Sequence, residues 1–493
     1  MGRKLIALTA SLMVIAAACA SDGSGADSDA SSSNAAGTDT TASTASVSDS
    51  SDASQPAGSQ QTAEQPSDAS DDGVLEVPLE FATIQDAVTA AAEGDLVLIS
   101  PGTYHEAVDV VTHNLTIRGL DRDGVILDGE LTLDNGIRVL GANGVAIENL
   151  TAINYTANGL YWISASGYRA SYITTSRTGD YGIYAYDSVK GQIEHSHTVG
   201  SRDAGVYIGQ CFPCDAVIDD VVSSNNGLGY SGTNSGGDLL IVNSVFHHNR
   251  AGVVTNSATY ELCYPQRRTT LAGNLVYSNN QTDTAAIDEA LLAQGNGILI
   301  SGGIGDIVTR NRVFDHVRTG IGVVPFPEED PNDDMPTAAV WDTTCDVQKT
   351  QALVIPEGAL LWDSFDNRIT GNIVSESGLA DIGIGSVGTD LSTLGNCWSD
   401  NEITSSRPAG LQSLAPCDAT GDGGNWTVDP LDVVAWLTEL ASLPPEVDWK
   451  IAPLPEIGSH DSMPDAATAP AHPATDVPRS VDLDAITVPD APT

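Results

Sequence analysis

Two aspartates occupy matching places in neighbouring repeats of this sequence. Asp180 and Asp203 lie 23 residues apart, and each precedes a glycine, Gly182 or Gly205, by two positions. If the two segments stack, the carboxylates lie about 5 Å apart, and their repulsion raises the pKa of one of them. One could then act as an acid and the other as a base, as glycoside cleavage or proton abstraction requires, with Arg202 beside them to neutralise a carboxylate or substrate. Aspartates also cap the turn before a glycine, which is the commoner arrangement.

A column of tyrosines occupies another repeated position. Tyr161, Tyr184 and Tyr207 each lie two residues after a repeat glycine, between apolar residues. Because alternate side chains of a strand point to opposite faces, we expect these rings to point outward on consecutive repeats. Such a row can stack on sugar rings, and Gln210 and Asn234 in a neighbouring column could add polar contacts. Alternatively, the rings only stabilise the sheet by pairing with one another.

Both sets of residues belong to a repeat of about 23 residues that must position them. Glycines recur at this spacing, and apolar residues occupy the first and third positions after most of them (Gly136, Gly159, Gly182, Gly205, Gly229, Gly252, Gly297, Gly320). Asparagines near the end of the next apolar segment are expected to stack at corners (Asn149, Asn243, Asn274, Asn311, Asn372). This unit is too short for a helix pair but fits one coil of three short strands, and stacked coils form the core. The sequence therefore predicts an all-β, right-handed parallel β-helix.

Two repeats contain insertions, between Gly252 and Gly297 and between Gly320 and Gly383. Insertions in coiled repeats fall on loops at one edge, often the binding edge. Six cysteines remain once Cys19 is set aside, and an even number in an exported protein suggests disulfides. The coil alignment predicts the pairs Cys211–Cys214, Cys263–Cys345 and Cys397–Cys417. The Cys-Phe-Pro-Cys motif could instead be a redox or metal-binding pair, but no second such motif or paired histidines complete a metal site.

The N-terminus has the features of an export signal. Arg3 and Lys4 precede an apolar stretch that ends in small residues before Cys19, which predicts a lipoprotein signal peptide over residues 1–19 with the lipid on that cysteine. Ordinary cleavage after an Ala-x-Ala sequence is the alternative. Residues 20–73 contain no aromatic or basic residue, which predicts a disordered acidic tether. We therefore expect an exported chain anchored at the extracytoplasmic face of the cell membrane.

Charge limits the partners of the folded part. The 66 acidic and 20 basic residues give a net charge of −46, which disfavours nucleic acid and anionic membrane surfaces. We expect a monomer, with an envelope protein as a conceivable partner, and membrane contact through the lipid alone. No motif in the sequence predicts a cofactor or a metal site. Binding of Ca²⁺ by acidic residues stays an alternative. The β-helix is expected over residues 74–424, with a capping helix over 82–92, and a short helix and Pro/Ala-rich tail over 425–493.

Several segments resemble known β-helix families. Thr83-Ile-Gln-Asp-Ala-Val and Pro101-Gly-Thr-Tyr-His-Glu resemble the opening of pectin-lyase-like proteins, including pectin methylesterases. Tyr181-Gly-Ile-Tyr and Asp203-Ala-Gly-Val-Tyr-Ile-Gly-Gln resemble a family of bacterial parallel β-helix lipoproteins with no assigned activity. The resemblance implies the fold, but this superfamily holds lyases, hydrolases, esterases, epimerases and binding proteins. The sequence lacks Asp-Phe-Ile-Phe-Gly of pectin esterases, Gly-His-Gly of polygalacturonases and Asp-Pro-His of alginate epimerases.

These observations favour a membrane-anchored protein that binds a polysaccharide or oligosaccharide. If the two aspartates and Arg202 also perform chemistry, the protein is a polysaccharide lyase, hydrolase or epimerase. The alternative is a non-catalytic structural or assembly lipoprotein of the cell envelope. A helper in metal-enzyme maturation is a third hypothesis, which no set of His and Cys ligands supports. Exposure of the tyrosine column would favour the first hypothesis.

Overall fold

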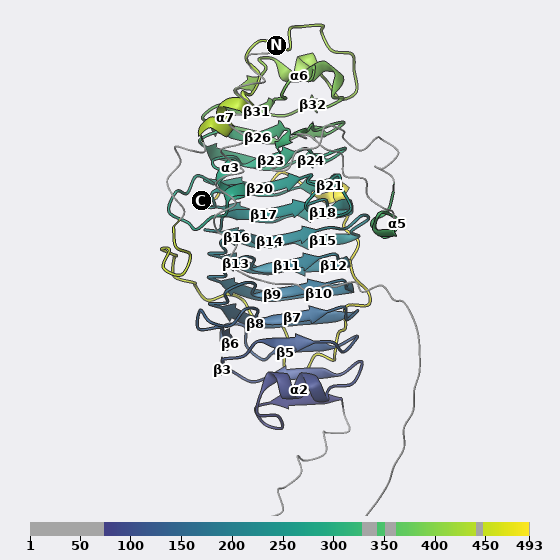
Figure 1. Cartoon of the computed structure of the whole chain (residues 1–493), viewed down its shortest axis with the longest axis vertical. Coiled ribbons are helices and arrows are strands. Elements are labelled where there is room, and N and C mark those ends of the chain that lie inside the picture. The colour runs from purple at the N-terminus through teal and green to yellow at the C-terminus, as the bar shows by residue number, and fades with distance from the viewer. Residues whose placement is uncertain (1–72, 328–342, 351–360, 440–446, 493) are drawn as a thin grey trace, which may run out of the picture.

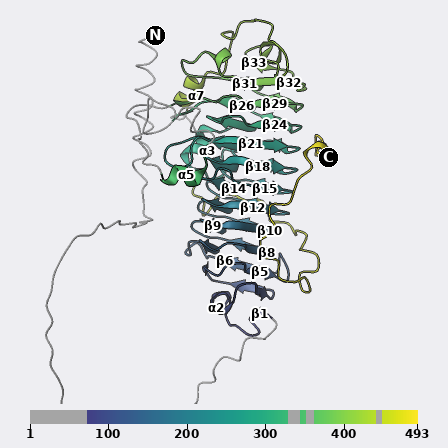
Figure 2. The same ribbon diagram turned by 90° about the vertical axis from the view of Figure 1, so that its right-hand side faces the viewer.

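The strands stack along one axis as successive coils (Figures 1 and 2). The computed structural model describes residues 73–327, 343–350, 361–439 and 447–492, so the expected signal peptide, Cys19 and the tether lie outside the described residues. Strands of consecutive coils pair in parallel, and an antiparallel pair joins β27 (Phe326–Pro327) to β28 (Leu361–Trp362). The parallel β-helix predicted from the glycine repeat is confirmed.

One wall of the coil is an 11-stranded sheet, here called the tyrosine sheet. Its strands are β4 (Val108–Val110), β7 (Ile137–Leu140), β9 (Leu160–Ile163), β11 (Ile183–Tyr186), β14 (Ala204–Gly209), β17 (Leu228–Thr233), β20 (Ala251–Asn256), β23 (Ile298–Ser301), β26 (Thr319–Val324), β31 (Ala380–Ile384) and β33 (Ser406–Arg407). The register places Tyr161 opposite Tyr184 and Tyr184 opposite Tyr207. The tyrosine column inferred from the glycine spacing is therefore confirmed.

The remaining strands of the coil form the other walls. They are β1 (Val74–Val77), β2 (Leu96–Ile99), β3 (Gly102–Tyr104), β5 (Thr116–Gly119), β6 (Val125–Asp128), β8 (Val145–Ile153), β10 (Ser166–Ser176), β12 (Val189–Glu194), β13 (His197–Val199), β15 (Ala216–Asp219), β16 (Val222–Ser224), β18 (Gly236–Val242), β19 (Val245–His247), β21 (Arg267–Ala272), β22 (Leu275–Tyr277), β24 (Ile307–Thr309), β25 (Arg312–His316), β29 (Arg368–Thr370), β30 (Ile373–Ser377) and β32 (Cys397–Ser399). Inward-pointing Ile, Val and Leu side chains from all walls form one continuous core.

Asparagines form a ladder at one corner of the coil. Asn274 donates to the side-chain oxygen of Asn311 at 3.0 Å, and Asn311 donates to that of Asn372 at 2.9 Å. The other two expected members do not join it, because Asn149 bonds to the Gly119 carbonyl and Asn243 to the Asp219 side chain. The expectation is therefore right for three asparagines and wrong for two, whose amides meet different neighbours.

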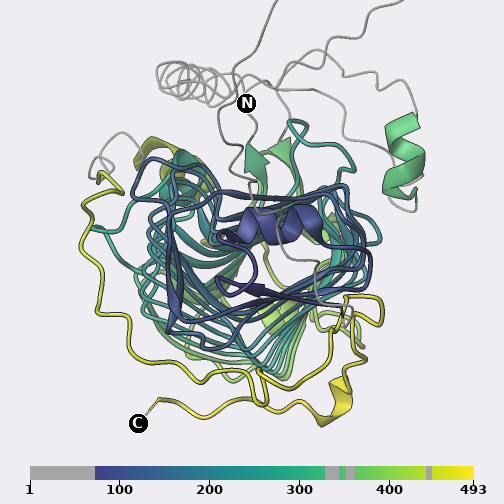
Figure 3. The same ribbon diagram turned by 90° about the horizontal axis from the view of Figure 1, so that it is seen from below.

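Helices close the ends of the coil and line its edge. Helix α2 (Ile84–Ala90) covers the first coil (Figure 3), with Ile84, Ala87 and Val88 buried and the Thr83 hydroxyl accepting from the Asp86 amide at 3.0 Å. It is shorter than the expected 82–92. The others are α3 (Asp288–Leu292), α5 (Cys345–Thr350), α6 (Leu411–Leu414) and α7 (Val433–Glu439). In the described part of the chain, no helix is long and apolar enough to cross a membrane.

The end of the chain returns along the outside of the coil (Figure 3). We call residues 447–492 the C-terminal strap. Its Met463 amide donates to Asn149 at 2.7 Å, its Ala474 amide donates to the Gly144 carbonyl at 2.9 Å, and Ile486 packs against Ala272. The sequence left open whether this tail wraps the domain, and the structure shows that the strap does.

Beneath the strap lies a row of buried charges, here called the charge ladder. It consists of Arg118, Glu148, Arg169 and Glu194 from four neighbouring strands, with side chains at most 5% exposed. Arg118 bonds to one oxygen of Glu148 at 2.7 Å, Arg169 bonds to its other oxygen, and Arg169 also bonds to Glu194 at 2.7 Å. Carbonyl groups of the strap accept from Arg118, so the strap satisfies charges that the coil alone leaves exposed.

Candidate functional site

A pocket of about 130 Å³ lies on the outward face of the tyrosine sheet. Tyr207, Ser231, Val254 and Leu299 form its floor, and they occupy one column on consecutive strands. Its walls come from the insertion after β20, from the region of α3, from β27 and from α7, through residues that include Tyr260, Glu261, Leu292, Phe326 and Trp436. The insertions therefore lie beside the pocket, as their place in the repeat predicted.

Stacked tyrosines lead into this pocket. The ring centroids of Tyr161 and Tyr184 lie 4.8 Å apart, and those of Tyr184 and Tyr207 lie 4.9 Å apart. Tyr181 stacks on Tyr184 at 4.4 Å, with the ring planes 4° apart. Tyr161 and Tyr184 are half-buried, whereas Tyr207 is only 2% exposed. The expectation of an exposed strip is therefore wrong at Tyr207, where Glu261 of the insertion bonds to the tyrosine hydroxyl, and the rings of Tyr161 and Tyr184 are only partly exposed.

Glu261, from that insertion, is the acid of the pocket; the residue as a whole is half-buried, and its Oε2 oxygen is buried. Its Oε1 accepts a hydrogen bond from the Tyr207 hydroxyl, and its Oε2 is buried without a hydrogen-bond partner among the described residues. Burial raises the pKa of this carboxyl to about 8, because an apolar environment disfavours the charged form. The sequence analysis missed Glu261, since it lies outside the repeat. Its position two residues before Cys263, in a loop tied to the coil, is the signal that could have indicated it.

The two aspartates of the repeat stack as expected but have different surroundings. The Asp203 amide donates to the Asp180 carbonyl at 3.0 Å. Asp203 is 8% exposed, lines the pocket and is hydrogen-bonded to Tyr181. Asp180 is half-buried and is not part of the pocket lining. Burial raises the pKa of Asp180 and the charge of Arg202 lowers it, so the expected cause, repulsion between the aspartates, is wrong for Asp180. Of this pair, only Asp203 lies at the pocket.

Comparison with known proteins supports the architecture. Residues 135–325 match the family model described as "Right handed beta helix region". This segment is a right-handed β-helix. No curated relative matches the sequence.

Three solved structures illustrate the likeness of this β-helix to others. The A-module of mannuronan C-5 epimerase AlgE4 from Azotobacter vinelandii shares 15% identity with a TM-score of 0.43, over 72% of this chain and 98% of that one. An alginate lyase from Paenibacillus sp. shares 14% identity with a TM-score of 0.36, over 50% of this chain and 90% of that one. The catalytic domain of a GH87 α-1,3-glucanase in complex with nigerose shares 12% identity with a TM-score of 0.35, over 73% of this chain and 70% of that one. Likeness at this level does not extend to activity.

Two polar residues of the expected site hold the insertion of the β-helix in place. The Gln210 side-chain oxygen accepts from the Tyr186 hydroxyl and from the Leu262 amide, both at 2.8 Å. Asn234 donates to the carbonyls of Ala258 and Glu261 at 2.6 and 2.8 Å. Neither belongs to the pocket lining. The Gln210 side-chain oxygen and the Asn234 amide therefore support the insertion, and contact of these two residues with a ligand stays a prediction.

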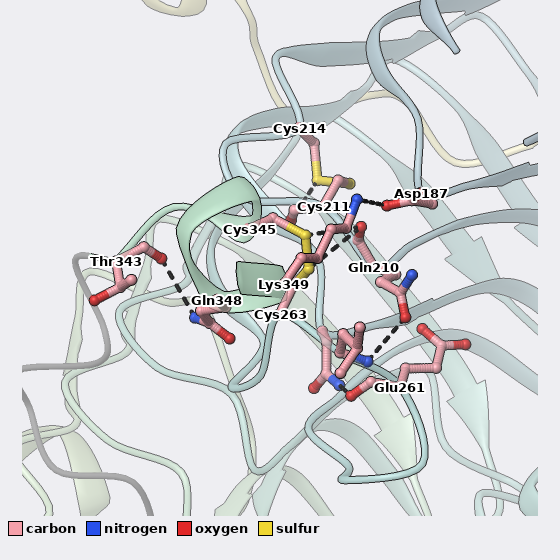
Figure 4. Close-up of a disulfide and its surroundings, with 12 residues drawn as sticks. Asp187, Gln210, Cys211, Cys214, Glu261, Cys263, Thr343, Cys345, Gln348 and Lys349 are labelled. Atoms are coloured by element: carbon pink, nitrogen blue, oxygen red, sulfur yellow. Dashed lines mark hydrogen bonds and ion pairs between the residues drawn. A yellow bond between two sulfur atoms is a disulfide. The ribbon is translucent and has the colours of Figure 1, made fainter. Parts of the chain in front are cut away.

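The three expected disulfides are present: Cys211–Cys214, Cys263–Cys345 and Cys397–Cys417. Figure 4 shows the first two side by side next to α5, and the Cys345 amide donates to the Phe212 carbonyl at 2.8 Å. Lys349 of α5 also bonds to Asp187 (Figure 4). Cys263 follows Glu261 by two residues, so these bonds fix the loop that carries the acid of the pocket.

Proposed function

We propose that this protein binds a polysaccharide at the pocket and along the tyrosines that lead into it. The row of Tyr161, Tyr184 and Tyr207, with centroids 4.8 and 4.9 Å apart, carries this proposal. Aromatic faces of this kind stack on the apolar faces of sugar rings, and their hydroxyls add hydrogen bonds. A chain of sugars could lie across successive coils and place one unit in the pocket.

The pocket has the mixture of groups that ligand sites use. Apolar side chains such as Val254 and Trp436 alternate with the hydroxyl and amide groups of Ser231, Thr233 and Asn256. A few polar groups set among apolar ones are typical of small-molecule sites. The alternative, a structural or assembly lipoprotein, gains support from the burial of Tyr207 and from the contacts among the tyrosine rings. The position of Tyr207 in the pocket lining favours binding, because tyrosines that merely support a sheet need not border a pocket.

Replacing Tyr184 with alanine is expected to weaken glycan binding by about 1 kcal/mol, roughly fivefold in Kd. The ring is half-buried and stacks on neighbouring tyrosines, so the melting temperature should also fall, and the affinity is measured at a temperature where the variant is folded. Binding of the full-length protein to an array of neutral and acidic glycans, followed by titration of each ligand, measures the effect.

The matched control is Tyr277→Ala, a half-buried tyrosine of β22 on another wall, which should bind normally. Unchanged affinity after replacement of Tyr161, Tyr184 and Tyr207 together would contradict the proposed site and favour the structural alternative.

We further propose that a lipid on Cys19 holds the protein at the extracytoplasmic face of the membrane, because small residues lead directly into this cysteine. Cys19→Ser is then expected to release the protein into the medium or to leave it as a precursor. Phase separation in detergent checks this, and a variant that partitions into the detergent phase as the wild type does would refute lipidation.

A further inference from the structure

We propose that Glu261 is the proton donor of a hydrolytic site that cleaves a glycosidic bond of a neutral glycan, with Asp203 as the general base. This inference rests on the proposed function, because its substrate is the glycan bound at the tyrosines.

The hydrogen bond from Tyr207 determines which oxygen of Glu261 carries the proton. The Tyr207 hydroxyl donates to Oε1, so that oxygen is an acceptor. Oε2 is buried, lacks a hydrogen-bond partner among the described residues and belongs to a residue of the pocket lining. A buried carboxylate without a second donor is costly, and a carboxyl group with a proton on Oε2 removes that cost. Glu261 can therefore present an acidic proton to a ligand.

Asp203 supplies a second carboxyl group in a different environment. It lines the same pocket, and the Tyr181 hydroxyl is hydrogen-bonded to it. Both carboxyl groups have a hydrogen bond with a tyrosine hydroxyl, but Oε2 of Glu261 is buried with no hydrogen-bond partner among the described residues. A buried oxygen without a donor favours the protonated form, so Glu261 is the acid of the pair and Asp203 is left as the base.

The lining of the pocket points to an uncharged substrate. It contains the acidic residues Asp203 and Glu261, and no Lys, Arg or His is among the described residues that line it. The whole chain carries a net charge of −46. A uronate would bring a further negative charge to a lining that has no cation among its described residues, and Arg318 behind Trp436 is already paired with Glu439, so a neutral sugar fits better.

The proposed step consumes one water molecule and balances as follows. The proton of Glu261 moves to the glycosidic oxygen, and the bond from the anomeric carbon to that oxygen breaks with its electron pair on the leaving sugar. The water oxygen bonds to the anomeric carbon while Asp203 accepts the water proton. Solvent then carries this proton from Asp203 back to Glu261. Each turnover releases one new reducing end.

The charge states predict the pH profile. Glu261 must be protonated, and its pKa is raised to about 8, so the rate should fall as pH rises through about 8. Tyr207 lowers the pKa of Glu261 through its hydrogen bond, and the neighbouring tyrosines are Tyr184 and Tyr186; burial, followed by the charge of Glu261, raises the pKa of all three tyrosines. The tyrosine hydroxyls therefore stay protonated over the pH range in which the rate falls. The fall in rate is then caused by deprotonation of Glu261.

The test begins with binding. Full-length Glu261→Gln is screened against cellohexaose, laminarihexaose, maltohexaose, xylohexaose, mannohexaose and an array of neutral and uronate polysaccharides. Each glycan that binds is then incubated with the wild type, Glu261→Gln and Asp203→Asn, and new reducing ends are measured. We expect the wild type to cleave a neutral glycan, and both variants to bind it but to turn it over at least about 100-fold more slowly. Glu376→Gln, an exposed carboxyl group of β30 on another wall, is the matched control and should retain full turnover.

Two measurements separate proton donation from a merely structural role. Tyr207→Phe removes a hydrogen bond that lowers the pKa of Glu261, so the alkaline limb should move to higher pH. A dinitrophenyl glycoside of the cleaved sugar has a leaving group that needs no proton, so Glu261→Gln should hydrolyse it far better than the natural glycan, whereas Asp203→Asn should not. Circular dichroism verifies that each variant is folded.

The outcomes distinguish this inference from the proposed function. A neutral glycan that binds but is never cleaved by the wild type would overturn hydrolysis and leave binding intact. Cleavage restricted to uronate polymers would overturn the substrate class. An unchanged alkaline limb in Tyr207→Phe, or no recovery of Glu261→Gln on the dinitrophenyl glycoside, would overturn the role of Glu261. Absence of binding to every glycan would overturn both proposals.

Discussion

Replacing Glu148 with alanine is expected to lower the free energy of unfolding by about 3–5 kcal/mol. The Glu148 side chain is fully buried and bonds to the guanidinium groups of both Arg118 and Arg169. Without this carboxylate, two buried cations of the charge ladder lose a counterion, and the strap offers Arg118 only carbonyl oxygens. Leaving a buried charge without its partner costs far more than an ion pair contributes at a surface. Unfolding in urea at neutral pH measures the loss.

Asp418→Ala is the matched control for the charge ladder. Its partner Arg368 is 44% exposed and Asp418 is 84% exposed, so water replaces the lost interaction and the change should stay below about 1 kcal/mol. If Glu148→Ala lost no more stability than this control, the charge ladder would have to be open to solvent.

Removing the Cys263–Cys345 disulfide by replacing both cysteines with serine is expected to cost roughly 4 kcal/mol of stability. The bond joins residues 82 positions apart, so it removes much of the chain entropy of the unfolded state. The same change also frees the loop that carries Glu261, so glycan affinity should fall together with the melting temperature. Chemical unfolding and glycan titration of the double variant measure the two effects.

The Cys211–Cys214 pair provides the comparison for this prediction. It spans 3 residues, so its removal should cost only about 2 kcal/mol. Equal losses for the two disulfides would show that native packing, rather than loop closure, decides their contribution.

The repeating part of the chain could be predicted from the sequence because each coil meets similar neighbours. The glycine spacing fixed the alignment of Tyr161, Tyr184 and Tyr207, and the register agrees with it. The same alignment placed Cys211, Cys214, Cys263 and Cys345 at one edge, where two of the disulfides are found, and the third predicted disulfide, Cys397–Cys417, is present as well. Such regularities follow from a local pattern, since every strand pairs with the one a coil away.

The site itself could be predicted only in part, because its walls do not repeat. The 23-residue spacing of the repeat identified Asp203. Glu261 lies in the insertion, where the residues do not align with positions of other coils. Tyr207 was expected to be open, yet it is buried, and Glu261 of that insertion bonds to its hydroxyl. Asn234 and Gln210 are polar residues at outward positions, and only the path of the insertion shows that they support it. Tertiary contacts of irregular segments decide these details.

The C-terminal strap has a consequence for how the protein folds. A stack of coils can grow by adding neighbours, since each coil contacts only the next one. Here, however, Arg118 in the first coils bonds to Ala469, 351 positions along the chain. Contacts between residues so far apart in the sequence are slow to form. The N-terminal coils can therefore assemble early, but they reach their final stability only when the strap binds to them. A slow refolding phase should therefore report on the N-terminal coils, although they are the first part of the domain in the sequence.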